Sequence, residues 1–221
     1  SLIMALNING TTGISGVDGS VSAPALTGTD SNTGITFPAA DTIKFSTGGV
    51  ERMAITNSGI SGITAGITMA DQWRITADGT LSQSSVDVFT ANWERVDTDG
   101  YAQLGSGMTE SSGIFTFPST GIYQITFHMP YGRNGGSTYF GQARIETTEN
   151  NSSYDLAAAG YGSFGQNFGR NTATAVFIFD VTDTSTHKVR FSGYSDNDSV
   201  RFFGGTGANL NSATFIRLGD T

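Results

Sequence analysis

Apolar and polar residues alternate along several short segments in the second half of the chain. In the segment 122–129, Ile-Tyr-Gln-Ile-Thr-Phe-His-Met, the alternation places Tyr123, Ile125, Phe127 and Met129 on one face. The same period of two recurs in three later segments, 175–181, 189–191 and 213–215. Because the side chains of a strand point alternately to its two faces, this pattern predicts β-strands with one buried face.

Turn residues separate these segments at short intervals, as at 99–100 (Asp-Gly) and 134–136 (Asn-Gly-Gly). About eight to ten strands joined by such turns predict an antiparallel jelly-roll sandwich for the second half. One segment, 155–160 (Asp-Leu-Ala-Ala-Ala-Gly), has a helix-favouring composition and could form a single helical turn. The prediction for this half is otherwise entirely β.

The first part of the chain carries short strand-like runs closed by glycine, such as 34–37 (Gly-Ile-Thr-Phe) and 51–55 (Glu-Arg-Met-Ala-Ile). Two stretches, beginning at Gly34 and Gly66, share Gly-Ile-Thr, a spacer with Ala-Asp, a strand and a glycine turn. Repeats too thin to bury an apolar face alone must stack on neighbours. One chain has too few repeats for a solenoid, so we expect three chains to form a thin intertwined β stalk. The alternative is a flexible tail with chance periodicity.

The core of this stalk is expected to consist of the apolar residues of the runs. Three chains around one axis would bury Ile35, Phe37, Ile43, Phe45, Met53, Ile55, Trp73 and Ile75.

Composition also changes along the chain: three aromatic residues precede residue 86, whereas all seven tyrosines follow it. A compact domain needs bulky apolar groups to offset the entropy of chain ordering. We therefore predict a stalk at 1–85 and a globular head at 86–221.

Charge and composition argue against several classes of protein. The formal net charge of −8 disfavours a nucleic-acid-binding protein, which needs a basic face to replace counterions around phosphates, and it disfavours docking on anionic lipid. The sequence has no run of about 18 apolar residues, so membrane insertion is not expected. It also has no cysteine, so stability must come from packing or from association with other chains.

The stretches NINGTTGISGVDGS, GTDSNTGITFPAADTIKFSTGG and ERMAITNSG fall within residues 5–80. They resemble the N-terminal and shaft repeats of tail-fibre and other virion fibre proteins of bacteriophages, particularly marine phages and cyanophages. This resemblance implies that residues 4–30 attach the protein to the virion, through a tail or capsid protein. It also implies that the following repeats space and trimerise the fibre.

The segment 113–129, GIFTFPSTGIYQITFHM, resembles the signature of the complement 1q/TNF-like globular head. Phe115, Gly121, Tyr123 and Phe127 fall on that pattern, and Ile125 occupies its second aromatic position. Two upstream positions depart from it, with Met108 in place of an aromatic residue and Gln103 in place of Asn or Asp. The ending NSATFIRLG resembles the last strand of the family. The resemblance covers residues 86–219 and implies a homotrimeric jelly-roll head.

The search for catalytic residues favours a protein that is not an enzyme and has no cofactor. The two histidines, His128 and His187, have no second histidine at metal-ligand spacing, and no Gly-x-Ser-x-Gly motif is present. Four acids could in principle form a pair for glycoside hydrolysis: Glu110, Glu146, Glu149 and Asp155. A calcium site at 196–198 (Asp-Asn-Asp) is a minor alternative to a polar hairpin tip, and we predict no metal.

Two glycine-rich stretches of the head mix aromatic residues with Asn, Gln and Arg. Rigid aromatic groups and directional hydrogen bonds suit recognition of a sugar or a protein surface. The candidate receptor-binding residues are Tyr131, Arg133, Asn134, Tyr139, Tyr161, Phe164, Asn167, Phe168 and Arg170. The alternative is that these aromatic residues pack under the loops or across a trimer interface.

Together these features predict a homotrimeric phage tail fibre or receptor-binding protein at the virion surface. The N-terminus would bind a tail or capsid protein, and the head would bind a host cell-surface glycan or protein. Three weak sites on one axis would hold the host surface by avidity. The alternatives are a capsid or tail decoration fibre without a specific receptor, a small glycan depolymerase, and a bacterial surface lectin with a complement-type head.

Overall fold

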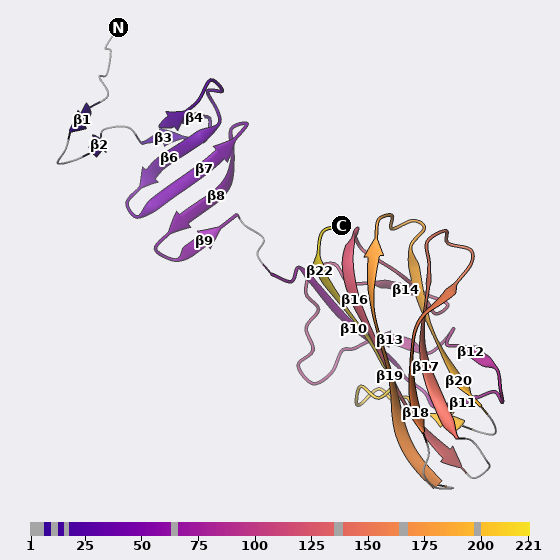
Figure 1. Cartoon of the computed structure of the whole chain (residues 1–221). Coiled ribbons are helices and arrows are strands. Elements are labelled where there is room, and N and C mark those ends of the chain that lie inside the picture. The colour runs from indigo at the N-terminus through magenta and orange to yellow at the C-terminus, as the bar shows by residue number, and fades with distance from the viewer. Residues whose placement is uncertain are drawn as a thin grey trace. The chain divides into compact units, whose positions relative to one another are not determined.

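The structure is a computed structural model that describes residues 7–9, 13–15, 18–62, 66–134, 139–163, 168–196 and 200–221. The chain divides into two compact units, Ser1–Ala65 and Gly66–Thr221, which are described separately here (Figure 1). Every regular element among the described residues is a β-strand. The described part of the chain contains no helix long and apolar enough to cross a membrane.

The N-terminal unit is built around one antiparallel meander. Its strands, in order, are β5 (Leu26–Thr27), β6 (Gly34–Ala39), β7 (Thr42–Thr47), β8 (Val50–Thr56) and β9 (Gly59–Ser61). Gly48 and Gly49 connect β7 to β8 and both have positive φ, which matches the twist that a two-residue hairpin turn requires. Two short hairpins precede the meander: β1 (Asn7–Asn9) with β2 (Gly13–Ser15), and β3 (Gly19–Ser20) with β4 (Ala23–Pro24).

The C-terminal unit consists of two sheets. The first sheet has the order β13 (Trp93–Arg95), β10 (Met69–Ile75), β22 (Ser212–Gly219), β16 (Gly121–Asn134), β19 (Phe168–Val181). Beyond β22, the same edge of β16 pairs with β21 (Val200–Phe202), which pairs in turn with β11 (Gly79–Leu81). The second sheet has the order β14 (Thr109–Ser111), β15 (Ile114–Thr116), β20 (Lys188–Ser195), β17 (Phe140–Thr148), β18 (Asp155–Ser163), and β12 (Val86–Val88) also pairs with β20.

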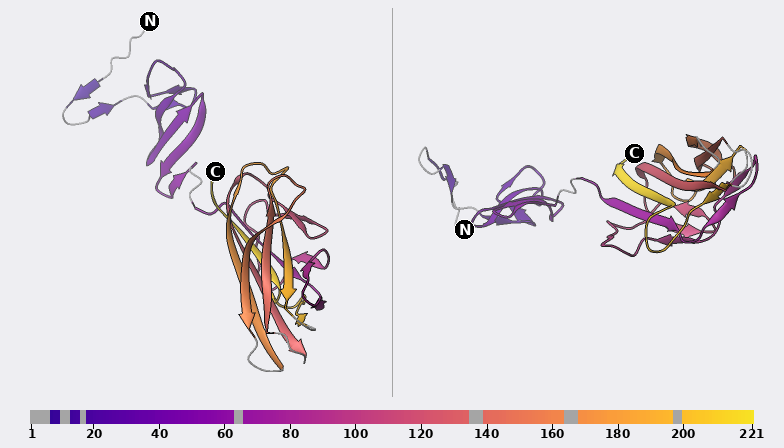
Figure 2. Two further views of the ribbon diagram at one scale, coloured as in Figure 1. Left: turned by 45° about the vertical axis from the view of Figure 1, so that its right-hand side comes forward. Right: turned by 90° about the horizontal axis from the view of Figure 1, so that it is seen from below.

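The two sheets lie face to face and bury a shared aromatic core (Figure 2). Phe115 of the second sheet lies 5.4 Å from Phe191 and 5.3 Å from Phe215, measured between ring centroids. Tyr123, Ile125, Phe127 and Met129 are fully buried, which confirms the face predicted from the alternation in 122–129. Each such side chain contributes about 1.5–3 kcal/mol by leaving water. The sandwich therefore holds a core of its own.

The division between the units lies between Ala65 and Gly66, which corrects the division predicted after residue 85. Residues 69–75 form β10, whose backbone pairs with β22 along Met69–Arg74 and with β13. Ile75 is buried in the core of the sandwich, and the Trp73 ring lies 5.5 Å from that of Phe115. Both residues were predicted for the stalk core and belong to the head instead. The low aromatic content before residue 86 led to the wrong boundary. Strand β10 belongs to the head although most of the aromatic rings in the head core lie after residue 86.

The segment 155–160 is part of strand β18 and not a helical turn. Its residues pair with β17 from Thr147–Asp155 to Ala143–Gly160. Gly160 also lies so close to Thr174 that a Cβ atom would fall 1.7 Å from the Thr174 carbonyl oxygen. Pairing with the neighbouring strand therefore outweighs the helix preference of the alanines, as tertiary context often does.

The strand register shows which strand ends lie together at each end of the sandwich. The chain enters at β10, where Met69 pairs with Arg217, and the last pair of β22 with β16 is Gly219–Ile122. Strands β16 and β19 end their pairing at Asn134 and Phe168, at the opposite end of the unit (Figure 1). The end of β16 and the start of β19 thus lie far from the point where the chain enters the head.

Candidate functional site

One face of the N-terminal meander is apolar and uncovered within the described chain. The register aligns Leu26, Ile35, Phe45 and Met53 across four strands. A second row aligns Ile43, Ile55 and Ile60. We name this set, with Phe37, the apolar sheet face; its residues are Leu26, Ile35, Phe37, Ile43, Phe45, Met53, Ile55 and Ile60. Phe37, Ile43 and Ile55 are each 37% exposed, and Ile60 is 62% exposed.

The opposite face of the meander is covered by the preceding hairpin. Thr36, Ser46 and Ala54 are buried on that side, and strands β3 and β4 pack against β6. None of the described residues covers the apolar sheet face in this way, and a hollow of about 530 Å³ opens on it beside Phe37, Ile43 and Ile55. Soluble monomers rarely expose a contiguous apolar surface of this kind. Six of the eight residues predicted for the stalk core lie on this face: Ile35, Phe37, Ile43, Phe45, Met53 and Ile55.

A second candidate surface lies on the outward side of the second sheet of the head. The register places Tyr194, Gln142 and Tyr161 in one row across β20, β17 and β18. The Phe140 ring lies 5.4 Å from that of Tyr161 and 6.0 Å from that of Tyr194. We name these three rings, Phe140, Tyr161 and Tyr194, the aromatic patch. Tyr161 is 65% exposed, so the patch meets solvent.

Polar groups hold the aromatic patch in place. The Arg144 guanidinium donates from Nη1 to Oε1 of Gln142 at 2.8 Å, which holds the amide of this buried residue in the row between Tyr161 and Tyr194. The carboxylate of Asp196 accepts from the backbone N–H groups of Tyr139 at 3.0 Å and Phe140 at 3.2 Å, which anchors the start of β17. A rigid, partly exposed aromatic surface suits stacking against a sugar ring or an apolar part of a protein surface.

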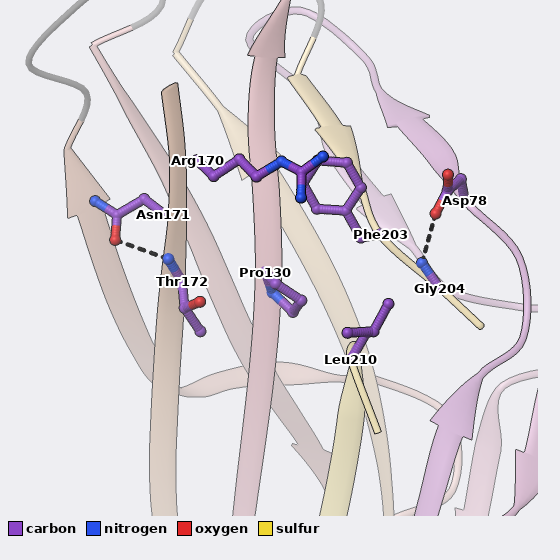
Figure 3. A pocket seen from close by; sticks show the side chains of 8 residues that line it. All are labelled: Asp78, Pro130, Arg170, Asn171, Thr172, Phe203, Gly204 and Leu210. Atoms are coloured by element: carbon purple, nitrogen blue, oxygen red, sulfur yellow. Dashed lines mark hydrogen bonds between the residues drawn. The ribbon is translucent and has the colours of Figure 1, made fainter. Parts of the chain in front are cut away.

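A third candidate is a pocket of about 440 Å³ on the outward side of the first sheet (Figure 3). Pro130 and Thr172, which face each other across β16 and β19, line it together with Asn171 and Leu210. The Arg170 guanidinium lies over the Phe203 ring, with its central carbon 4.7 Å from the ring centroid. We name this the Arg170 pocket.

Asp78 closes one side of the Arg170 pocket. Its carboxylate accepts from the Gly204 backbone N–H at 2.8 Å and forms an ion pair with Arg201. The Gly204 hydrogen bond and the Arg201 guanidinium hold the pKa of Asp78 below its usual range, so this side of the pocket stays anionic.

The structure separates the nine predicted receptor-binding residues. Tyr161 is exposed at the aromatic patch, Tyr139 is exposed just before β17, and Arg170 lines the Arg170 pocket on the other sheet. Arg133, Asn134 and Phe168 occupy paired strand positions, and their side chains lie outside the described part. Phe164 and Asn167 lie outside the described residues altogether. Phe140, Tyr194 and Phe203 were not predicted, although the period of two along β17 and β20 could have placed the first two outward.

Tyr131 is not a surface residue, which corrects its place among the candidates. It continues the inward series of β16 after Met129 and is fully buried. Its hydroxyl donates to the Gly162 carbonyl oxygen, and burial raises the pKa of Tyr131. For Tyr131 the alternative interpretation, in which an aromatic candidate packs inside the protein, is therefore correct.

The two histidines, and Glu146 among the acids considered for catalysis, have local partners. His128 contacts the Thr174 hydroxyl at 2.9 Å, and His187 lies between Thr182 and Thr186. Glu146 is buried and accepts from Arg190 at 2.8 Å and Ser192 at 2.6 Å. Among the residues that the structure describes, no three His, Asp or Glu side chains are grouped so that they could hold a metal ion. Asn197 and Asp198 of the calcium alternative lie outside the described residues.

The most heavily hydrogen-bonded acid of the head is Asp71, whose side chain is fully buried. Its carboxylate accepts from Tyr101 Oη at 2.7 Å, the Met108 N–H at 2.7 Å and Trp73 Nε1 at 2.9 Å. Arg95 donates to it from Nε at 3.0 Å. Burial raises the pKa of Asp71, but the bonds from Arg95, Tyr101 and Trp73 outweigh it and leave the pKa lowered. Burial and the bond to Asp71 raise the pKa of Tyr101 to about 12. This centre ties β10 to β13 and to the connection 96–108.

Comparison with known proteins identifies the fold. The sequence matches no protein-family model, and no curated protein sequence is similar to it. The structure of Eiger TNF from S. frugiperda is similar with a TM-score of 0.52 and 10% identity, covering 71% of this chain and 95% of that chain. The two-sheet sandwich is a TNF-like jelly roll. This confirms the predicted fold of the head.

Two further solved structures are similar at lower TM-scores. Murine APRIL has a TM-score of 0.48 and 13% identity, covering 68% of this chain and 98% of that chain. The vertex protein P5 of PRD1 has a TM-score of 0.45 and 16% identity, covering 70% of this chain and all (100%) of that chain.

Asp71→Asn is expected to destabilise the head by about 3 kcal/mol at pH 7, because it leaves buried donors without an anionic acceptor. The pKa of Asp71 is lower in the folded state than its ordinary 3.8, so the carboxylate stabilises the fold fully above that value. That stabilisation is lost as the pH falls through the lowered pKa. Urea unfolding between pH 2 and pH 7 measures the effect. The variant should show a smaller loss of stability below about pH 4 than the wild type.

Asp155→Asn is the matched control, because Asp155 is exposed on β18. It should change the free energy of unfolding by less than about 0.5 kcal/mol. Equal stability of Asp71→Asn and the wild type at pH 7 would contradict the role given to the buried carboxylate.

Proposed function

We propose that this chain is a homotrimeric, non-enzymatic fibre protein of a phage virion that attaches the particle to a host surface. The observation that carries the proposal is the apolar sheet face, which a single meander cannot bury by itself. Two further copies would cover it. The resemblance of residues 5–80 to phage fibre repeats supports the virion location, and the resemblance of residues 86–219 to complement 1q/TNF-like heads supports a threefold assembly.

Attachment at the N-terminus agrees with the layout of the head. The chain enters the head at Met69, beside the C-terminal strand. The end of β16 and the start of β19 lie at the other end of the same unit. A fibre held through its N-terminal residues, by a tail or capsid protein, would therefore present these strand ends away from the point where the chain enters the head.

The aromatic patch supports a role in host binding. Tyr161 and Tyr194 offer flat apolar surfaces, and the buried Gln142 lies between them in the register with its amide held by Arg144. Stacking on aromatic rings is a usual means by which proteins bind sugars and exposed peptide surfaces. One such site would be weak, and three on one rigid trimer would act by avidity.

The assembly is tested by charging the apolar sheet face. In the variant Ile55→Asp/Ile60→Asp, two carboxylates face each other across β8 and β9, where burial between chains would be costly. We expect trypsin to cleave the meander after Lys44 or Arg52 at least about tenfold faster than in the wild type, because the sheet opens when copies no longer cover it.

The control is Ser58→Asp/Ser61→Asp, which adds the same charge at exposed positions off the apolar sheet face. It should be cleaved at the wild-type rate. If the Ile55→Asp/Ile60→Asp variant is also cleaved at the wild-type rate, the apolar sheet face is not buried between copies and the proposed stalk is wrong.

Host binding is tested at Tyr161. The full-length protein is screened for binding to immobilised glycans and host-surface proteins, and the best ligand is then measured with Tyr161→Ala. Losing one stacked ring should weaken binding about tenfold or more. Leu156→Ala, an exposed apolar position on the same strand, is the control and should bind normally. Absence of any bound glycan or surface protein would favour the decoration-fibre alternative.

A further inference from the structure

The Arg170 pocket contains a cation that forms no ion pair with any residue that the structure describes, although it is near enough to Asp78 to help lower the pKa of that carboxyl. Arg170 is exposed on β19, and the central carbon of its guanidinium lies 4.7 Å from the centroid of the Phe203 ring. Arg201, 5.9 Å from the same ring, is already paired with Asp78. The pocket is therefore lined by Arg170 and by Asp78, which is paired with Arg201, and these three groups together carry one net positive charge.

The stacking prepares Arg170 for a planar anion. A guanidinium lying over a ring keeps its N–H groups pointing sideways, where they can reach both oxygens of a carboxylate. The ring itself is fixed. The Phe203 N–H donates to the Pro130 carbonyl at 3.1 Å, and the ring edge lies against Gly132, where a Cβ atom would come within 2.7 Å of it. The absence of a side chain at Gly132 is what allows this close approach.

The rest of the lining suits a small, partly apolar ligand. Pro130 and Leu210 offer apolar surface, and Figure 3 shows both side chains beside the space in front of Phe203. Thr172 adds an exposed hydroxyl. Asp78 offers a carboxylate that could accept from a ligand hydroxyl group. The volume of about 440 Å³ falls in the range of small-molecule pockets.

The charge balance favours a singly charged ligand. Arg170, Arg201 and Asp78 together carry one net positive charge, which matches one carboxylate, whereas a phosphate group carries up to about two negative charges at neutral pH. Asp78 and the formal net charge of −8 would both repel the second charge. We propose that the Arg170 pocket binds the carboxylate-bearing sugar unit of an acidic glycan, with the carboxylate on Arg170 and the sugar ring over Pro130 and Leu210.

This inference rests on the proposed attachment function for its biological meaning, and it names the class of glycan that the head would recognise. It also requires that the outward side of the first sheet stay open at this pocket in the assembled protein. The binding test below uses the full-length protein, so an assembly that covers the pocket would show itself as an absence of binding.

The probes are methyl β-glucuronide and methyl β-glucoside, which differ in the carboxylate alone, titrated into the full-length protein by ligand-observed NMR. We expect the glucuronide to bind with a Kd of roughly 1–10 mM. The glucoside should bind at least about tenfold more weakly. Arg170→Gln should remove the difference between the two sugars, and Arg170→Lys should keep part of it because the charge remains without the planar fork. Arg52→Gln, in the N-terminal unit, is the control and should change nothing.

Three outcomes would overturn the proposal: no glucuronide binding up to about 10 mM, equal binding of the two sugars, or full discrimination by Arg170→Gln. Tighter binding of methyl glucoside 6-sulfate than of the glucuronide would overturn the assignment to a carboxylate. Failure here leaves host binding through the aromatic patch intact, because that is measured separately with Tyr161→Ala. Loss of host binding with glucuronide binding retained would instead count against the attachment function.

Discussion

A sheet one layer thick cannot bury both of its own faces, and this constraint governs the N-terminal unit. The hairpin of β3 and β4 covers the side that carries Thr36 and Ser46. The other side carries eight large apolar residues and no described cover. The turn Gly48-Gly49 joins β7 directly to β8 and therefore adds no further layer to the sheet. The proposed threefold stalk follows from this deficit, because other copies would supply the missing layer.

The head differs from the N-terminal unit, because its two sheets bury their apolar faces against each other. Rings such as Phe115 and Phe191 fill the space between the sheets, and the buried carboxylate of Asp71 ties β10 into them. The residues on the outward sides of the sheets are consequently not needed to form the core. One carries the aromatic patch and the other carries the Arg170 pocket. A rigid scaffold with distinct surfaces on its two sheets is suited to holding a ligand at more than one point.

Local patterns in the sequence were sufficient to predict part of this structure. Alternation from Tyr123 to Met129 predicted the buried face because burial on a strand repeats every two residues. The same rule placed six stalk-core residues on one face of the meander. It could not place Trp73 and Ile75, because β10 pairs with β22 at the far end of the sequence. The rule also could not predict the contact between Arg170 and Phe203, since the two residues meet only through the pairing of β16 with β19 and β21. Tyr131 was misassigned although its own alternation marked it as buried.

The central claim is that copies of this chain cover the apolar sheet face of one another. Light scattering of the full-length protein measures this most directly, through its mass in solution at several concentrations. The account predicts a mass three times that of the 23.1 kDa chain, unchanged on dilution through the micromolar range. A mass of 23.1 kDa at all concentrations would contradict it, because the apolar sheet face would then be exposed in a stable monomer.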